Sequence, residues 1–301
     1  MTRMIEENSV TKTRPLPVWF RQELPDMEQI RKLKAMFRSS GLHTVCESAR
    51  CPNIGACWGQ GVATFMILGE ICTRACRFCA VKAGRPLNAD PHEPYHVALA
   101  VQSLNLRYVV ITSVARDDME DEGADQFCQT IAQIRQLTPQ TKIEVLIPDF
   151  SNKMESLKKL VVSSPEVVSH NIETVKRLSV NIRPQAGYER SLQVLRNFKQ
   201  MNPEILTKSS FMVGLGETMD EIKGLMGDLL ETGCDILTIG QYLRPTQLRR
   251  HLPVERFYTP DEFGGLNRLG LEMGFKYVMS GPLVRSSFIA EQGYRECLKI
   301  L

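Results

Sequence analysis

Short apolar runs alternate with amphipathic segments along most of this 301-residue chain, and this alternation limits the fold more than any other feature. Apolar runs typical of buried strands occupy 63–69, 108–113, 142–147, 167–173, 211–213 and 235–240, with a last short one at 276–279. Amphipathic patterns predict helices at 26–41, 124–137, 154–161, 192–198, 222–230 and 262–273. Such alternation predicts a parallel sheet, and six or more repeats predict a full or partial α/β barrel.

Polar residues and glycines follow several of these predicted strands. The chemistry of such barrels collects at the carboxyl ends of the strands, so side chains there are candidates for a site. A plainer interpretation is that strand ends are polar in any protein and that each group only caps its own strand. The candidates at strand ends are Thr112, Asn171, Glu173, Gly214, Gly216 and Glu217.

Charge and hydropathy exclude several classes of function. The 37 basic and 34 acidic residues give a net charge of +3, which argues against a nucleic-acid-binding arm or a polybasic membrane patch. No apolar run approaches the roughly 20 residues that a membrane-spanning helix needs. Glu6 and Glu7 interrupt the basic N-terminus, which no apolar stretch follows, so targeting signals are disfavoured. We therefore expect a cytoplasmic protein that acts on neither nucleic acid nor a membrane.

The chain has nine cysteines, and six of them fall into two closely spaced groups. Cys46, Cys51 and Cys57 are spaced C-x4-C-x5-C, and Cys72, Cys76 and Cys79 are spaced C-x3-C-x2-C. A cytosolic protein seldom carries a disulfide framework, so metal binding is the better interpretation. Thiolates are the usual ligands of iron–sulfur clusters. A zinc site, which typically uses two C-x2–4-C pairs, and an electron-transfer ferredoxin are the alternatives.

The array of Cys72, Cys76 and Cys79, with Phe78 before its last member, resembles the signature of the radical S-adenosylmethionine (SAM) enzymes. The resemblance implies that these three thiols hold a [4Fe–4S] cluster and that the amino and carboxylate groups of SAM chelate its fourth iron. Reduction would then cleave SAM to methionine and a 5′-deoxyadenosyl radical. Within the superfamily, a methylthiotransferase and a biotin-synthase relative are alternatives, although methylthiotransferases carry added domains at each end.

Nearly the whole chain, from about Trp19 to about Gly293, is similar to the lipoyl synthase family. The segments that carry this resemblance are 46–57 (CESARCPNIGAC), 64–69 (TFMILG), 71–74 (ICTR), 107–114 (RYVVITSV), 212–218 (MVGLGET), 240–243 (GQYL) and 251–254 (HLPV). The resemblance implies a partial parallel (β/α)6 barrel of the radical SAM type, covering 62–275. It further implies an N-terminal extension over 1–61 with the second cysteine group, and a C-terminal extension over 276–301.

In that family the C-x4-C-x5-C thiols bind an auxiliary [4Fe–4S] cluster, and a serine of an R-S-S-Y motif is its fourth ligand. Here the motif is 285–288 (RSSF), so phenylalanine replaces tyrosine. We favour Ser287 as the ligand, with Ser286 as the alternative. A second departure is Glu122, where we expect glycine, and the loop around it is expected to adopt a different turn.

The family reaction inserts two sulfur atoms, at C6 and C8, into an octanoyl chain attached to a lysine of a carrier protein. The resemblance implies that the auxiliary cluster donates this sulfur and that two SAM molecules are used per product. Thr112, Asn171, Glu173, Arg183, Gly214, Gly216 and Glu217 are candidate SAM contacts. The implied partners are an octanoylated lipoyl carrier domain or the glycine-cleavage H protein, and a ferredoxin- or flavodoxin-type reductant.

Overall fold

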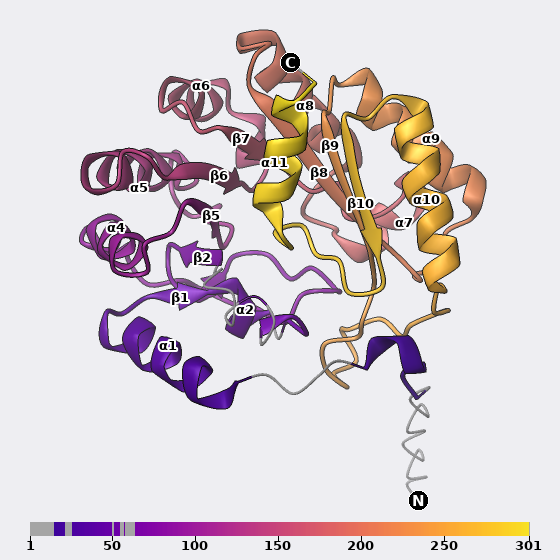
Figure 1. Cartoon of the computed structure of the whole chain (residues 1–301), viewed down its shortest axis with the longest axis horizontal. Coiled ribbons are helices and arrows are strands. Elements are labelled where there is room, and N and C mark those ends of the chain that lie inside the picture. The colour runs from indigo at the N-terminus through magenta and orange to yellow at the C-terminus, as the bar shows by residue number, and fades with distance from the viewer. Residues whose placement is uncertain (1–14, 22–25, 50, 55–56, 58–63, 301) are drawn as a thin grey trace, which may run out of the picture.

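An open, mostly parallel sheet forms the centre of the molecule in the computed structural model (Figure 1). The structure describes residues 15–21, 26–49, 51–54, 57 and 64–300. The eight neighbouring strands of this sheet are, in order, β1 (His43–Thr44), β2 (Thr64–Ile67), β5 (Tyr108–Ser113), β6 (Lys142–Leu146), β7 (Val167–Ser169), β8 (Leu206–Val213), β9 (Ile236–Gln241) and β10 (Tyr277–Gly281).

All of these strands pair in parallel except β1, which is antiparallel to β2. The strands β1 and β10 stand at opposite ends of the order, so the sheet is a barrel that does not close. A separate ladder joins β3 (Ile71–Cys72) to β4 (Lys82–Ala83). The predicted partial α/β barrel is therefore confirmed.

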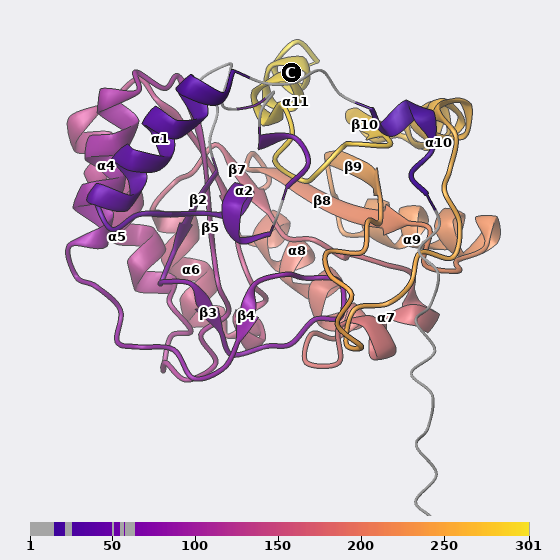
Figure 2. The same ribbon diagram turned by 90° about the horizontal axis from the view of Figure 1, so that it is seen from below.

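Helices cover the outer face of the curved sheet (Figures 1 and 2). Their buried sides are largely apolar: Phe127 of the helix Ala124–Leu137 and Ile111 of β5, for example, belong to one core. The helices are α1 (Met27–Ser39), α2 (Val45–Ser48), α4 (Glu93–Ser103), α5 (Ala124–Leu137), α6 (Met154–Val162), α7 (Lys176–Ile182), α8 (Tyr188–Met201), α9 (Met219–Glu231), α10 (Pro260–Met273) and α11 (Ala290–Leu298), with short 3-10 turns η1 (Val18–Phe20) and η2 (Phe150–Asn152).

Local sequence signals explain where the best-defined helices begin. At the start of α9, the Thr218 hydroxyl accepts from the Glu221 amide, and the Glu221 carboxylate accepts from the Thr218 amide. Thr259 and Glu262 make the same reciprocal pair at the start of α10. These capping boxes satisfy amides that the first helical turn leaves without partners.

The last helix, α11, covers the amino-terminal end of the barrel. Its Ala290 packs with Tyr108 and Val110 of β5, and Cys297 packs with Val167 of β7 and with the first residues of β8 and β9. Tyr294 contacts both groups. Because α11 covers this end, the opposite, carboxyl end of the sheet is the one left for a site.

A buried ion pair lies inside the barrel near the same amino-terminal end. Lys208 of β8 is 2% exposed, and its Nζ atom lies 2.8 Å from the carboxylate of Glu144 on β6, which is 1% exposed. The hydroxyl of Tyr108 donates to the same carboxylate at 2.7 Å. Burial, and then Glu144, hold the pKa of Tyr108 well above its usual value, so this hydroxyl remains a donor.

Lys208→Met is expected to lower the free energy of unfolding by about 3–5 kcal/mol, because it leaves the Glu144 carboxylate buried without its cation. The matched control is Lys158→Met, which removes a Lys–Glu pair whose side chains are 57% and 82% exposed. That change is expected to cost less than about 1 kcal/mol. Chemical denaturation of both variants measures the difference, and equal losses would contradict the role given to the buried pair.

Two strands differ from the predictions. β8 begins at Leu206 rather than at 211, because polar residues such as Lys208 and Ser209 are buried there with partners. β7 ends at Ser169 rather than at 173, and Glu173 makes only an isolated bridge to Phe211. Helices α4, α7 and α11 were not predicted from the sequence.

Candidate functional site

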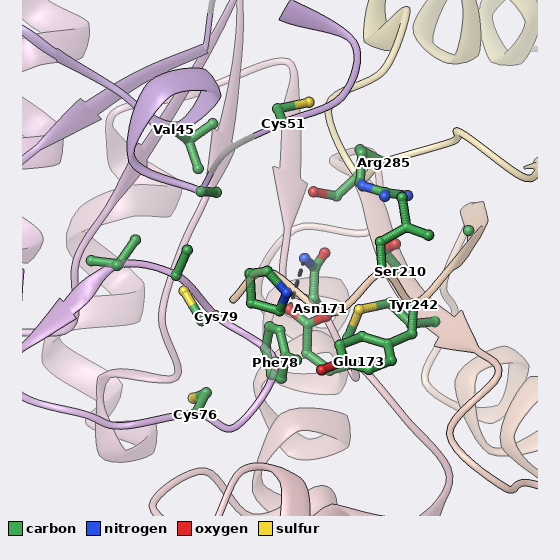
Figure 3. A pocket seen from close by; sticks show the side chains of 18 of the residues that line it. Val45, Cys51, Cys76, Phe78, Cys79, Asn171, Glu173, Ser210, Tyr242 and Arg285 are labelled. Atoms are coloured by element: carbon green, nitrogen blue, oxygen red, sulfur yellow. Dashed lines mark hydrogen bonds between the residues drawn. The ribbon is translucent and has the colours of Figure 1, made fainter. Parts of the chain in front are cut away.

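A cavity of about 980 Å³ lies at the carboxyl ends of the parallel strands, the edge where barrels of this kind carry their chemistry. The ends of β5, β8 and β9 line it together with the segments that follow β3 and β10. Figure 3 shows the cavity from close by, with Cys76, Phe78 and Cys79 on one side and Asn171 and Glu173 facing them. The lining includes all six clustered thiols, Cys46, Cys51, Cys57, Cys72, Cys76 and Cys79, and also Ser286 and Ser287.

The loop that carries Cys72, Cys76 and Cys79 is held by several elements of the barrel. The Cys72 sulfur accepts from the Ala115 amide at 3.3 Å, just beyond β5. The amide of Arg77 donates to the carbonyl of Ile182 at the end of α7, at 2.8 Å. The three thiols are therefore fixed at the carboxyl edge of the sheet.

Arg74, within the same loop, is 6% exposed and pairs with two carboxylates. Its guanidinium contacts Asp117 through both Nε and Nη2, and Nη2 lies 2.7 Å from the fully buried Asp149 beyond β6. Burial alone would raise the pKa of Asp149, but the hydrogen bond and charge of Arg74 lower it to about 2. This pairing ties the thiol loop to the ends of β5 and β6.

The other thiol group comes from the N-terminal part of the chain and meets the C-terminal part across the cavity. Cys46 lies on α2, and Cys51 and Cys57 follow it. The side-chain amide of Asn53 donates to the carbonyl of Leu283 at 2.6 Å, across 230 positions of sequence. This contact holds the segment that contains Ser286 and Ser287 beside the second thiol group.

Burial favours the protonated form of several of the clustered thiols, so that binding of a cluster, which takes thiolates, would release their protons. Burial, and to a lesser extent the neighbouring Cys46 and Cys51, raise the pKa of Cys57 to about 12. Burial, and to a lesser extent the neighbouring Cys79, raise the pKa of Cys76 to about 12. In the part of the chain that the structure describes, no three His, Cys, Asp or Glu side chains could hold a single metal ion. Four ligands share the four irons of a [4Fe–4S] cluster, so cluster thiols need not converge on one ion.

Four of the predicted SAM contacts line the cavity: Thr112, Asn171, Glu173 and Arg183. The Asn171 amide donates to Glu173 at 3.0 Å, while the buried Oδ1 atom of Asn171 has no hydrogen-bond partner among the described residues. Burial raises the pKa of Glu173, and the charge of Arg183 opposes that shift. The Thr112 hydroxyl donates to the carbonyl of Leu146, so that proton is used within the sheet.

The other three, Gly214, Gly216 and Glu217, are not among the described residues that line the cavity. The Glu217 carboxylate accepts from the amides of Gly214 and Leu215, and from the hydroxyl of Tyr258 at 2.9 Å. Gly214 has a φ of +99°, and a Cβ there would lie 2.0 Å from the Gln241 side chain. The structure thus gives these residues a role in the turn after β8, and their contact with SAM stays a prediction.

Sequence reasoning gave no separate role to two residues of this region. Arg285 lines the cavity, and its guanidinium hydrogen-bonds only the Val284 carbonyl among the described residues (Figure 3). Glu122, the departure from the expected glycine, has a left-handed φ of +55°. Its buried carboxylate lies 3.0 Å from Lys153. Glycine adopts this backbone conformation readily, and the difference from the family's turn stays a prediction.

Comparison with known proteins assigns this arrangement to a family. A sequence model of the radical SAM superfamily matches residues 66–229, and a model of the N-terminal domain of lipoyl synthase matches residues 3–51. The lipoyl synthase of Rubrobacter xylanophilus is 55% identical over 92% of this chain and 85% of that protein. The chain belongs to the lipoyl synthase family. The lipoyl synthase of Staphylococcus epidermidis is 51% identical over 94% of this chain and 93% of its own.

Solved structures support the fold assigned to this lipoyl synthase family member. Methylornithine synthase superposes with a TM-score of 0.56 and 13% identity, over 82% of this chain and 70% of that one. HydG, a maturase of the [FeFe]-hydrogenase, superposes with a TM-score of 0.55 and 13% identity, over 85% of this chain and 56% of the HydG chain. At this identity the likeness concerns the fold alone. It confirms the predicted barrel of the radical SAM type.

Family membership confirms the predicted enzyme class, a sulfur-inserting lipoyl synthase that uses SAM and iron–sulfur chemistry. Among the described residues, none of the helices has both the length and the apolar character to cross a membrane. The predicted boundaries at 61/62 and 275/276 and the roles of individual site residues stay predictions.

Proposed function

We propose that this lipoyl synthase inserts its two sulfur atoms at C6 and C8 of a lysine-bound octanoyl chain and draws them from an auxiliary [4Fe–4S] cluster. The observation that carries this proposal is that both thiol groups and the two serines line one cavity. An octanoyl chain in that cavity can reach both centres without leaving the protein. The apolar side chains of Leu243, Val254 and Phe257 also line the cavity and suit its hydrocarbon.

The reaction centre requires a cofactor because C6 and C8 carry unactivated C–H bonds, which no side-chain base can deprotonate. SAM together with a reduced iron–sulfur cluster supplies the radical chemistry that such bonds require. Cys72, Cys76 and Cys79 would hold this cluster, and because they are three thiols for four irons, one iron would be open to SAM. The Arg74 pairs with Asp117 and Asp149 keep the loop in position.

Polar atoms across from this loop receive SAM. The Oδ1 atom of Asn171 and the hydroxyl of Ser113 are buried, line the cavity and have no hydrogen-bond partner in the described structure. A buried polar atom without a partner is costly, and a bound polar ligand removes that cost. Glu173 and Arg183 add opposite charges at the same wall. Two insertions consume two SAM molecules per product.

Cys46, Cys51 and Cys57 hold the auxiliary cluster, with Ser287 as fourth ligand and Ser286 as the alternative. The Asn53 contact with Leu283 supports this assignment because it holds the serine segment beside these thiols. A serine oxygen is a harder ligand than a thiolate, and iron–sulfur sites favour soft donors. A serine would therefore bind its iron less tightly than the three thiolates bind theirs.

The substrate partner is an octanoylated lipoyl carrier domain or the glycine-cleavage H protein, and a ferredoxin- or flavodoxin-type protein supplies electrons. A reducing compartment keeps thiols available as metal ligands. This supports a cytoplasmic location.

Anaerobic turnover of an octanoyl-lysine peptide is expected to add two sulfur atoms to it, by way of a species with one sulfur. The protein is first reconstituted with iron and sulfide, and then receives SAM and a reductant. Mass spectrometry follows both masses over time, with omission of SAM as the control. A product without sulfur, formed while SAM is cleaved, would contradict the proposed function.

A further inference from the structure

One segment beside the cavity has more arginines than acidic residues to pair with them. Segment 244–257, between β9 and α10, contains four arginines and one glutamate. Gln247, Pro253 and Glu255 of this segment line the cavity and are exposed, as is Leu16, which is 61% exposed. Exposed lining residues mark the opening, so this basic segment borders it.

Three arginines of the segment and one of the thiol loop have no carboxylate partner among the residues that the structure describes. The Arg244 guanidinium contacts only Gln247 and backbone carbonyls, and Arg250 donates to the Val81 carbonyl. Arg77 donates to the side chain of Asn181 and the carbonyl of Arg250. Arg249 is exposed and makes no such contact. We call Arg77, Arg244, Arg249 and Arg250 the arginine rim.

The arginine rim is fixed beside the first thiol group. The Arg77 side chain donates to the Arg250 carbonyl at 3.2 Å, and the Leu252 amide donates to the Arg77 carbonyl at 3.3 Å. The His251 ring lies 2.9 Å from the carbonyl of Cys79. A partner seated on the rim is therefore held next to the loop that binds the SAM cluster.

We propose that the arginine rim docks an acidic surface of the octanoylated carrier protein. This rests on the proposed function, because a lysine-tethered chain reaches the cavity only if the carrier surface around that lysine covers the opening. Four guanidinium groups without carboxylates attract acidic side chains, speed association and orient the carrier. Leu248, which lies between Arg244 and Arg249 in sequence and is 58% exposed, adds an apolar contact.

Arg249→Glu tests the docking without touching the cavity, since Arg249 is not among its lining residues. At low ionic strength, the variant is expected to raise KM for an octanoylated acidic lipoyl domain roughly tenfold and to leave kcat unchanged. The difference should shrink as salt is added. KM for a short neutral octanoyl-lysine peptide should stay at the wild-type value.

The matched control is Arg107→Glu. Arg107 is exposed and directly precedes β5, so it lies at the opposite end of the barrel and carries the same change of charge. Equal KM values for the domain in both variants would overturn the docking surface while the function on the peptide stands. Sulfur insertion into neither substrate by the wild type would overturn both proposals. For the Arg249→Glu enzyme, KM should be lower for a lipoyl domain whose acidic residues are replaced by lysines than for the unaltered acidic domain.

Discussion

Replacing Cys72, Cys76 and Cys79 together by alanine is expected to abolish SAM cleavage by the reconstituted protein and to leave about four irons per chain, one [4Fe–4S] cluster. The physical reason is that only these three thiols stand on the loop held by Ala115, Arg74 and Ile182 at the carboxyl edge. The assay measures 5′-deoxyadenosine after addition of SAM, dithionite and octanoyl-lysine peptide, together with iron and sulfide content.

The matched control is Cys128→Ala. This thiol lies half-buried on α5 and is not among the lining residues of the cavity. The control is expected to keep the wild-type iron content, about eight per chain, and the wild-type rate of SAM cleavage. SAM cleavage by the triple variant at the wild-type rate would show that these thiols do not hold the SAM cluster.

Replacing Cys46, Cys51 and Cys57 by alanine is expected to separate the two chemistries. The triple variant should still cleave SAM, because the first thiol group keeps its anchors, but it should transfer no sulfur to the peptide. Its iron content should also fall to about four per chain. Mass spectrometry of the peptide and chromatography of 5′-deoxyadenosine, run on the same reaction, measure both outcomes.

Two single variants decide which serine is the ligand. Ser287→Ala is expected to reduce the iron held by the second thiol group and the yield of product, whereas Ser286→Ala should preserve both. Both serines line the cavity, so the pair is matched in position. The reverse pattern would assign the ligand to Ser286.

Sulfur insertion by the variant that lacks Cys46, Cys51 and Cys57 would contradict an auxiliary cluster as the sulfur source.

Most of the fold was predictable because its strands are apolar and its helices amphipathic. The helix predicted at 124–137 matches α5, and the strand predicted at 108–113 matches β5. The first half of β8 was not predicted because a buried lysine and serines look like a loop unless their partners are known. Lys208 finds Glu144 from another strand, and only the tertiary structure brings the two together.

The thiol groups were predictable from spacing alone, and the structure places both on one cavity. The contacts that hold them were not predictable, because they join distant parts of the chain. Arg74 meets Asp149 across 75 positions, and Asn53 meets Leu283 across 230. For Gly214 and Glu217, which the family resemblance suggests as SAM contacts, the structure shows a further role in the turn after β8 that the sequence did not reveal.

The bridge from Asn53 to Leu283 also bears on the order in which the protein matures. The ribosome synthesises Cys46, Cys51 and Cys57 long before residues 283–287, because Asn53 and Leu283 are 230 positions apart. These three thiols are therefore made before the segment that contains Ser286 and Ser287. If Ser287 is a ligand, as we propose, a cluster on these three thiols can be completed only after residues 283–287 have been added to the chain.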